Sequence, residues 1–137
     1  MKLRILDTTI ASLLLNQDPV VRQYDSDLDE AVLIISFQTV AEMRYGALLA
    51  NWGFHRVERL EEHFRDFEVI EYSDGLAYCW AQVMLDARRA GRRLESADGW
   101  VAATAKFMDA PLVAHDTDFD ARSCPSITVI NYARQPG

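Results

Sequence analysis

Short apolar runs alternate along the chain with longer segments in which apolar residues recur every three or four positions. The short runs are rich in Val, Ile and Leu, as expected of buried strands. They predict strands over Leu3–Leu6, Val32–Ser36, 67–72, 111–113 and 127–130. Strands that alternate with helices are typical of an α/β domain with a parallel sheet. The pattern therefore predicts a three-layer α/β/α sandwich around a central, mainly parallel five-stranded sheet.

The segments between these strands predict helices, because their apolar residues return with helical spacing. The expected helices cover 8–15, 20–28, 39–50, 55–66, 73–90 and 97–108. Small polar residues and proline mark helix starts. The residues expected at the starts are Thr8 or Thr9, Pro19, Gln38 or Thr39, and Ser96.

The length and composition suit one domain over residues 1–137, with half of the residues hydrophobic. A chain of this size can bury a core without metal or disulfide staples. Cys79 and Cys124 lack the spacing of a zinc site, so both are interpreted as small buried side chains of a reduced, cytoplasmic protein. The apolar runs are too short to span a bilayer, and no membrane association is expected.

The charge balance is acidic, with 14 Lys and Arg against 21 Asp and Glu and a net charge of -7. This is the wrong sign for holding nucleic acid by bulk electrostatics. A nucleic-acid substrate would require either carboxylates gathered around cations or a local basic patch.

Two acidic residues follow predicted strands. Asp7 comes directly after Leu3–Leu6, and Asp116 follows the apolar run 111–114 with one residue between them. Ligands of open α/β sheets bind beyond the carboxyl ends of the strands. Asp7 and Asp116 are therefore expected at the functional edge of the sheet, with Asp118 and Asp120 in the loop that follows.

Glu42 and Asp98 lie near the starts of two predicted helices that begin at this same edge. Two carboxylates about 5 Å apart repel by roughly 3 kcal/mol at an effective dielectric near 20, so a convergent set must share protons or hold a cation. An all-oxygen set favours Mg²⁺ or Mn²⁺. The alternative roles are helix caps for Asp7 and Asp98, a solvated helix position for Glu42 and a turn for Asp116.

Four segments of the sequence resemble the PIN-domain family, and within it the VapC-like toxins of bacterial toxin–antitoxin pairs. The segments are LDTT at 6–9, VAEMRYGA at 40–47, ADGWVAATA at 97–105 and PLVAHDTDF at 111–119. They occur in the family's order and spacing, and the resemblance extends over essentially the whole chain. The second and third are the most specific.

The resemblance implies a metal-dependent endoribonuclease whose acidic residues are Asp7, Glu42, Asp98 and Asp116. Asp118 is a second candidate for the last position, because D-x-D-F stands here where many relatives have N-x-x-D-F. Thr9 is a supporting residue, since the family often has Asn or Ser there. The implied cofactor is Mg²⁺ or Mn²⁺, and the implied partners are a structured RNA such as tRNA or rRNA, a cognate antitoxin and a second copy of the chain.

Four arginines are close together just before Asp98: Arg88, Arg89, Arg92 and Arg93. They are either a solvated helix end or a rim that contacts RNA phosphates beside an acidic centre. A separate apolar group, Tyr45, Leu48, Leu49 and Trp52, is expected to form a homodimer contact or to receive an antitoxin segment.

A second hypothesis is a catalytically inactive PIN-like module that only binds or regulates a partner. The complete acidic set argues against this, because a protein without catalysis has no reason to retain the repulsion. A phosphotransfer enzyme of the haloacid-dehalogenase type is a weaker alternative. Its D-x-D pattern is absent, since Asp7 is followed by Thr8 and Thr9.

Overall fold

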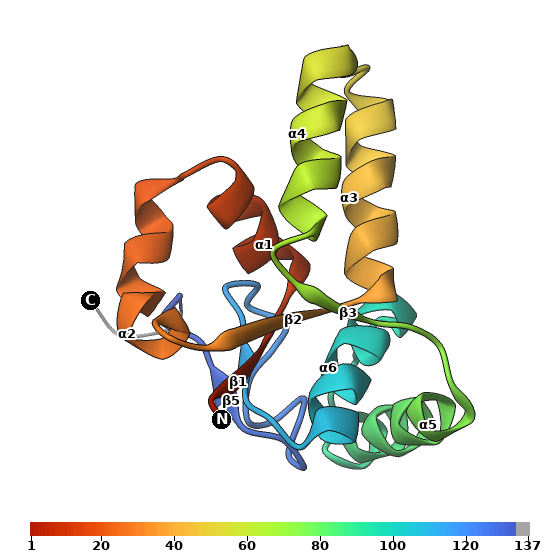
Figure 1. Cartoon of the computed structure of the whole chain (residues 1–137). Coiled ribbons are helices and arrows are strands. Elements are labelled where there is room, and N and C mark those ends of the chain that lie inside the picture. The colour runs from red at the N-terminus through yellow and green to blue at the C-terminus, as the bar shows by residue number, and fades with distance from the viewer. Residues whose placement is uncertain (134–137) are drawn as a thin grey trace.

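The computed structural model describes residues 1–133, so residues 134–137 of the predicted domain lie outside the described part of the chain. Parallel strands form a single sheet in the order β3-β2-β1-β4-β5 (Figure 1). Its strands are β1 (Leu3–Leu6), β2 (Val32–Ser36), β3 (Glu68–Ile70), β4 (Leu112–Val113) and β5 (Val129–Ile130). The predicted five-stranded parallel sheet is confirmed, although β3, β4 and β5 are shorter than predicted.

Helices lie between successive strands from β1 to β4 along the chain and cover both faces of the sheet. They are α1 (Thr8–Leu15), the 3₁₀ helix η1 (Pro19–Tyr24), α2 (Asp25–Leu28), α3 (Phe37–Leu49), α4 (Phe54–Phe64), α5 (Asp74–Arg89) and α6 (Ser96–Met108). The prediction of one helix over 20–28 is wrong, because η1 and α2 occupy this segment. Val21 and Tyr24 are buried three positions apart, which matches the three-residue turn of a 3₁₀ helix.

Strand residues alternate between two cores, one on each face of the sheet. Ile34 packs with α5 and α6, whereas its neighbour Ile35 packs on the opposite face with α1, η1, α3 and α4. Leu112 and Val113 divide in the same way between the two cores. This alternation follows from strand geometry, in which successive side chains point to opposite faces. Together the two cores make the three layers that the sequence predicts.

The starts of α1 and α3 differ from the prediction. Asp7 caps α1 in place of Thr8 or Thr9, and Ser36 caps α3 in place of Gln38 or Thr39. In both helices the capping residue is the first one after the last apolar position of a strand, so the chain turns directly from strand into helix. A carboxylate or hydroxyl at this point satisfies N–H groups that the first helical turn leaves free.

The start of α6 also differs, because Ser96 is the first residue of the helix and Glu95 precedes it without a side-chain capping bond. Ser96 is exposed, and its carbonyl oxygen accepts a hydrogen bond from Trp80 Nε1 (3.1 Å). The backbone of Ser96, rather than its hydroxyl, therefore makes the contact with α5.

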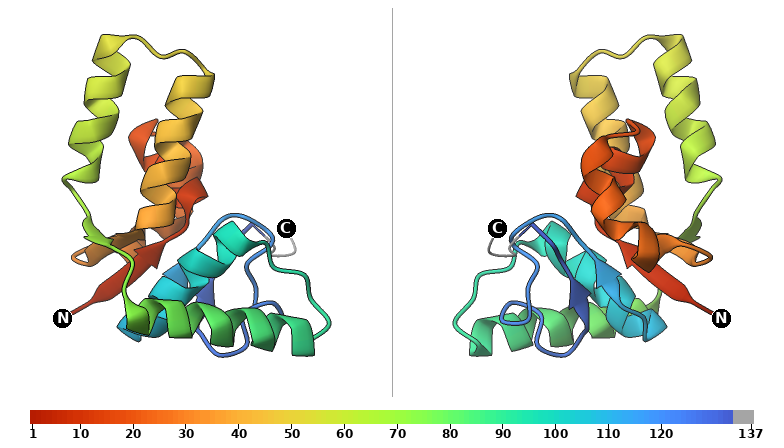
Figure 2. Two further views of the ribbon diagram at one scale, coloured as in Figure 1. Left: turned by 90° about the vertical axis from the view of Figure 1, so that its right-hand side faces the viewer. Right: turned by 90° about the vertical axis from the view of Figure 1, so that its left-hand side faces the viewer.

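Helices α3 and α4 form a hairpin that projects from the rest of the chain, as the side views show (Figure 2). Arg44 and Glu61 join the two helices through an exposed ion pair of 2.7 Å. Large apolar side chains are exposed on this hairpin: Tyr45, Leu48, Leu49 and Phe54. Trp52, which the sequence places with this group, is half-buried, and the Arg56 guanidinium lies 4.0 Å from its ring centre.

The interpretation of both cysteines as buried holds for Cys124, whereas Cys79 on α5 is only half-buried.

Within residues 1–133, no helix combines the length and the apolar character that crossing a membrane requires.

Replacing the Ser36 cap provides a test of these helix starts. We expect Ser36→Ala to lower the free energy of unfolding by about 1 kcal/mol, because the buried hydroxyl accepts the Gln38 N–H at 3.0 Å. Ser96→Ala is the matched control, and we expect a change below about 0.5 kcal/mol. Urea denaturation measures both, and equal losses in the two variants would contradict the observed caps.

Candidate active site

Asp7 lies at the carboxyl end of β1 and is only 1% exposed. Its Oδ1 accepts a hydrogen bond from the Ile10 N–H (2.8 Å), and its Oδ2 accepts from the N–H groups of His115 and Asp116 (both 3.1 Å). Burial raises the pKa of Asp7 to about 6, although the three N–H donors act to lower it. Asp7 therefore caps α1, as the alternative reading proposes, and also holds the loop after β4.

Asp98 lies in the first turn of α6 and is half-buried. Burial, as the largest cause, and repulsion from neighbouring carboxylates together raise its pKa to about 7. Those neighbours are Asp116, Asp118, Glu42 and Asp7. The structure thus brings Asp7, Glu42 and Asp116, together with Asp118, within electrostatic range of Asp98, and these five residues form the acidic centre.

Glu42 lies in the second turn of α3, where its Oε1 accepts a hydrogen bond from Gln38 Nε2 one turn earlier (3.1 Å). It also lines a groove of about 210 Å³ between α1 and α3. The hydroxyls of Thr8 and Thr39 meet at 3.0 Å and join the starts of these two helices. Thr9, the supporting residue expected from the sequence, is half-buried in the first turn of α1. The hydroxyl that contacts α3 is therefore that of Thr8 and not that of Thr9.

The loop after β4 is held by side chains from later in the chain. Asn131 Nδ2 donates to the carbonyl oxygens of Asp116 (2.9 Å) and Phe119 (3.1 Å), and Ser123 Oγ donates to that of Asp118 (2.7 Å). Asp116 Oδ1 in turn accepts the Asp118 N–H (2.9 Å). Asp116 is half-buried, whereas Asp118 is exposed. Both carboxylates therefore belong to one braced loop, with Asp116 the more enclosed.

Asp120, the third aspartate of this loop, has a structural contact. Its Oδ1 accepts the N–H groups of Arg122 (2.9 Å) and Ser123 (2.8 Å), which closes the turn that follows. This arrangement is an Asx-type turn, a common use of Asp in loops. Of the three aspartates in 116–120, Asp116 and Asp118 therefore lie near Asp98, whereas Asp120 stabilises the turn.

No three Asp, Glu, His or Cys side chains within the described residues 1–133 are arranged closely enough to hold one ion directly. Mutual repulsion tends to keep like charges apart. The chemistry of the donors is nevertheless uniform, since every carboxylate in the group offers oxygen and neither Cys nor His belongs to it. Such a set suits a hard divalent cation.

Gln38 and Asn131 support the acidic centre and were missed by the sequence reasoning. The sequence could have indicated both residues. Gln38 precedes Glu42 by one helical turn, and Asn131 follows the last predicted strand at the functional edge of the sheet. Ser123 had no such signal, because its bond to the loop depends on how the chain turns back on itself.

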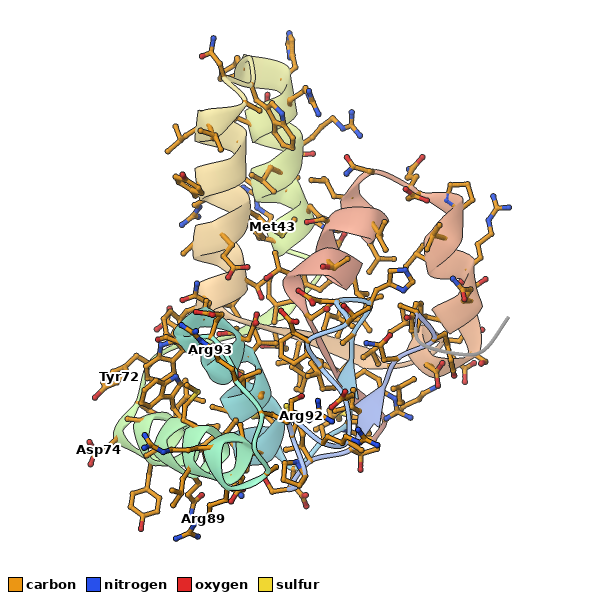
Figure 3. All side chains as sticks on the ribbon, turned by 180° about the vertical axis from the view of Figure 1, so that it is seen from behind. Met43, Tyr72, Asp74, Arg89, Arg92 and Arg93 are labelled. Carbon is orange, nitrogen blue, oxygen red and sulfur yellow. The ribbon has the colours of Figure 1, made fainter. Side chains whose placement is uncertain are left out.

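The four arginines are exposed at the end of α5 and along the segment before α6. Arg88, Arg92 and Arg93 line a groove of about 560 Å³ whose remaining walls include the apolar side chains of Leu85 and Leu94. In Figure 3, Arg89 extends outward from α5, whereas Arg92 and Arg93 follow the chain that leads to α6. The structure therefore places three of the arginines around one groove.

The sequence model of the PIN domain matches residues 4–123 of this chain. The match spans most of the chain, and the sheet order and the acidic edge described above accompany it. The chain belongs to the PIN-domain family. Within this family its relatives are VapC-like toxins, so the resemblance found in the sequence is confirmed.

Two curated relatives and one solved structure illustrate this likeness. Ribonuclease VapC5 from Mycobacterium tuberculosis (strain ATCC 25618 / H37Rv) is 33% identical over 102 residues, which cover 73% of this chain and 76% of that protein. Toxin FitB from Neisseria gonorrhoeae (strain ATCC 700825 / FA 1090) is 34% identical over 122 residues, covering 82% and 87%. The structure of FitAB bound to an IR36 DNA fragment aligns with a TM-score of 0.78 and 29% identity over 98% of each chain.

The raised pKa of Asp98 makes the stability of the metal-free protein depend on pH. The pKa of an Asp is near 3.9 in an unfolded chain, whereas that of Asp98 is about 7 in the folded protein. The free energy of unfolding therefore falls as the pH rises from about 4 to about 7, and the full loss is present above pH 7. We expect Asp98→Asn to raise the free energy of unfolding at pH 8 by about 2 kcal/mol, roughly half of what the full rise in pKa corresponds to.

Asp74→Asn is the matched control, since Asp74 also lies in the first turn of a helix but is exposed at the start of α5 (Figure 3). Denaturant titrations in EDTA at pH 4, 6 and 8 compare the two variants. A gain for Asp98→Asn that does not change between pH 4 and pH 8 would show that the charge of the Asp98 carboxylate is not its cause.

Proposed function

We propose that this protein is a divalent-metal-dependent endoribonuclease. The observation that carries the proposal is the convergence of Asp7, Glu42, Asp98, Asp116 and Asp118 at the carboxyl edge of the sheet. Burial and mutual repulsion raise the pKa of Asp7 and Asp98, so the site is energetically costly without a bound cation or protons. The name of the relative Ribonuclease VapC5 supports RNA as the substrate.

The cation that suits these donors is Mg²⁺, with Mn²⁺ as a substitute. Its ligands in this proposal are Asp7, Glu42, Asp98 and Asp116, and Asp118 is the alternative to Asp116 as the fourth. When bound, the cation supplies positive charge that polarises a phosphodiester and lowers the pKa of water for hydrolysis.

The residues of the chain hold this centre in place. Three N–H groups fix the Asp7 carboxylate between α1 and the loop after β4. Gln38 orients Glu42, and Asn131 braces the backbone of Asp116. Thr9 remains a supporting residue in the first turn of α1. Such preorganisation reduces the rearrangement needed when charge develops on a reacting phosphate.

The groove lined by Arg88, Arg92 and Arg93 is proposed to hold the RNA. Guanidinium groups bind phosphates, and the apolar wall at Leu85 and Leu94 can receive an unstacked base. Arg89, which extends outward from α5, would contact a more distant phosphate. A local basic rim of this kind reconciles RNA binding with the net charge of -7. A structured RNA such as tRNA or rRNA is the proposed substrate.

We further propose that the protein is the toxin of a type II toxin–antitoxin pair and acts in the cytoplasm. The structural neighbours include FitAB and a VapBC2 complex from Rickettsia felis, each described as bound to DNA. The exposed apolar side chains of the α3–α4 hairpin, Tyr45, Leu48, Leu49 and Phe54, suit a protein contact. An antitoxin and a second copy of the chain are the proposed partners.

Removing single carboxylates tests the proposed activity. We expect Glu42→Gln and Asp98→Asn each to lower the rate of cleavage of bulk tRNA or rRNA at least 100-fold, because each removes a charged ligand. EDTA should abolish wild-type cleavage, and added Mg²⁺ or Mn²⁺ should restore it. Gel electrophoresis of end-labelled RNA measures the rate.

Asp74→Asn again serves as the control and should cleave like the wild type. Asp7→Asn is expected to be inactive as well, but its amide would place N–H groups against the His115 and Asp116 donors, so loss of activity there is less specific. Cleavage that persists at the wild-type rate in Asp98→Asn and is EDTA-sensitive would refute the assignment. A folded wild-type chain that binds Mn²⁺ but leaves all RNA intact would favour the inactive binding module.

The arginine groove leads to a separate prediction about affinity. We expect the double variant Arg92→Ala/Arg93→Ala to bind a single-stranded RNA probe more weakly and to reduce the slope of log K against log salt by about 1.4, since each lost phosphate contact with a single strand removes roughly 0.7. Filter binding from 50 to 300 mM KCl, in the catalytically impaired Asp98→Asn background, measures the slope.

The charge-matched control is the double variant Arg22→Ala/Arg65→Ala, which removes one exposed arginine on η1 and one after α4. Equal slopes in the two double variants would leave the arginines with no role in RNA binding.

A further inference from the structure

The hydroxyl of Tyr24 lies buried at the centre of a hydrogen-bond cluster beside the acidic site. Tyr24 is the last residue of η1 and is 0% exposed. Its oxygen lies 2.9 Å from the carbonyl oxygen of Ala114, 2.8 Å from His115 Nδ1 and 3.0 Å from the backbone nitrogen of Tyr132. One side chain near the start of the sequence therefore contacts the ends of β4 and β5 simultaneously.

Proton accounting determines the direction of each bond. A hydroxyl has one proton to donate, the Ala114 carbonyl can only accept and the Tyr132 N–H can only donate. All three contacts are hydrogen bonds when Tyr24 donates to Ala114 and His115 donates its Nδ1 proton to Tyr24. Burial, and to a lesser extent the charge of Asp7, raises the pKa of Tyr24, so the hydroxyl keeps its proton.

The peptide segment that Tyr24 holds is also the one that holds Asp7. Ala114 and His115 contact the Tyr24 hydroxyl, while the N–H groups of His115 and Asp116 donate to Asp7 Oδ2. Tyr24 and Asp7 thus bind opposite sides of the peptide group between Ala114 and His115, Tyr24 through its C=O and Asp7 through its N–H. A change in the Tyr24 bonds would shift the two N–H donors on which the orientation of Asp7 depends.

We propose that Tyr24 is a positioning residue, whose hydroxyl fixes residues 114–116 so that their N–H groups orient the Asp7 carboxylate. The ring of Tyr24 also fills space, since it stacks on Tyr132 with centroids 4.8 Å apart and meets the His115 ring edge-on at 5.7 Å. Phenylalanine can keep these ring contacts but loses all three hydroxyl bonds. The hydroxyl, rather than the bulk of the ring, carries the proposed effect.

Tyr132 offers a matched control within the same cluster. Its hydroxyl donates to Asp27 Oδ2 (2.7 Å) and does not contact the 114–116 segment, while its ring stacks on Tyr24. Tyr132→Phe therefore removes a tyrosine hydroxyl next to Tyr24 but leaves the hydrogen bonds of residues 114–116 in place.

The test compares full-length Tyr24→Phe, Tyr132→Phe and wild type by two readouts. The first is the amide proton shift of His115 and Asp116 in metal-free ¹H–¹⁵N spectra, well below the unfolding temperature. The second is kcat and KM for cleavage of bulk tRNA with Mg²⁺, which rests on the proposed function. We expect Tyr24→Phe alone to move both amide signals and to lower kcat about tenfold with KM unchanged, the size typical of lost outer-sphere support.

The outcomes separate this inference from the proposed function. Tyr24→Phe that leaves the two amide signals and kcat unchanged, and lowers only thermal stability as Tyr132→Phe does, would overturn the positioning role while the nuclease proposal stands. If the wild type cleaves no RNA but Tyr24→Phe still moves the two amide signals and Tyr132→Phe does not, the nuclease proposal fails and the positioning of Asp7 is supported.

Discussion

Electrostatic repulsion among carboxylates at one edge of the sheet is the constraint on which the rest of this structure depends. Parallel strands end together, so the residues that follow β1 and β4 are brought to the same place whatever their charge. Burial and this repulsion raise the pKa of Asp7 and of Asp98. The fold keeps these groups together by surrounding them with hydrogen-bond donors and by anchoring them on rigid elements.

Asp7 shows how the fold and the site share one residue. It caps α1 and receives two N–H groups from a loop more than 100 positions later in the chain, so the same carboxylate stabilises a helix start and fixes the far end of the sheet. The loop is braced from outside as well, by Asn131 after β5 and by Tyr24 from η1. The orientation of the acidic centre is therefore a property of the packing of four separate segments.

Much of this architecture was predictable, and the errors have a common cause. Apolar periodicity located the strands and the long helices, because burial on one or both faces leaves a repeating pattern in the sequence. The Ser36 cap and the split of 20–28 into η1 and α2 were not predicted, and Asp7 was considered as a cap only as an alternative to its role at the site. In each case several residues were locally acceptable, and the choice depended on where a strand ended or on a buried contact such as that of Tyr24.

The sequence by itself determined the parallel sheet and the identity of the acidic residues at its carboxyl edge, since both follow from local pattern and from the rule that parallel strands end together. It also determined the all-oxygen character of the centre, because side-chain chemistry does not depend on folding. Only the tertiary structure decided which donors hold each carboxylate, that Gln38 and Asn131 support Glu42 and Asp116, and that the Tyr24 hydroxyl reaches the segment beside Asp7. The physical reason is that a hydrogen bond requires specific distances and directions between groups far apart in the chain, and these are set when the layers pack.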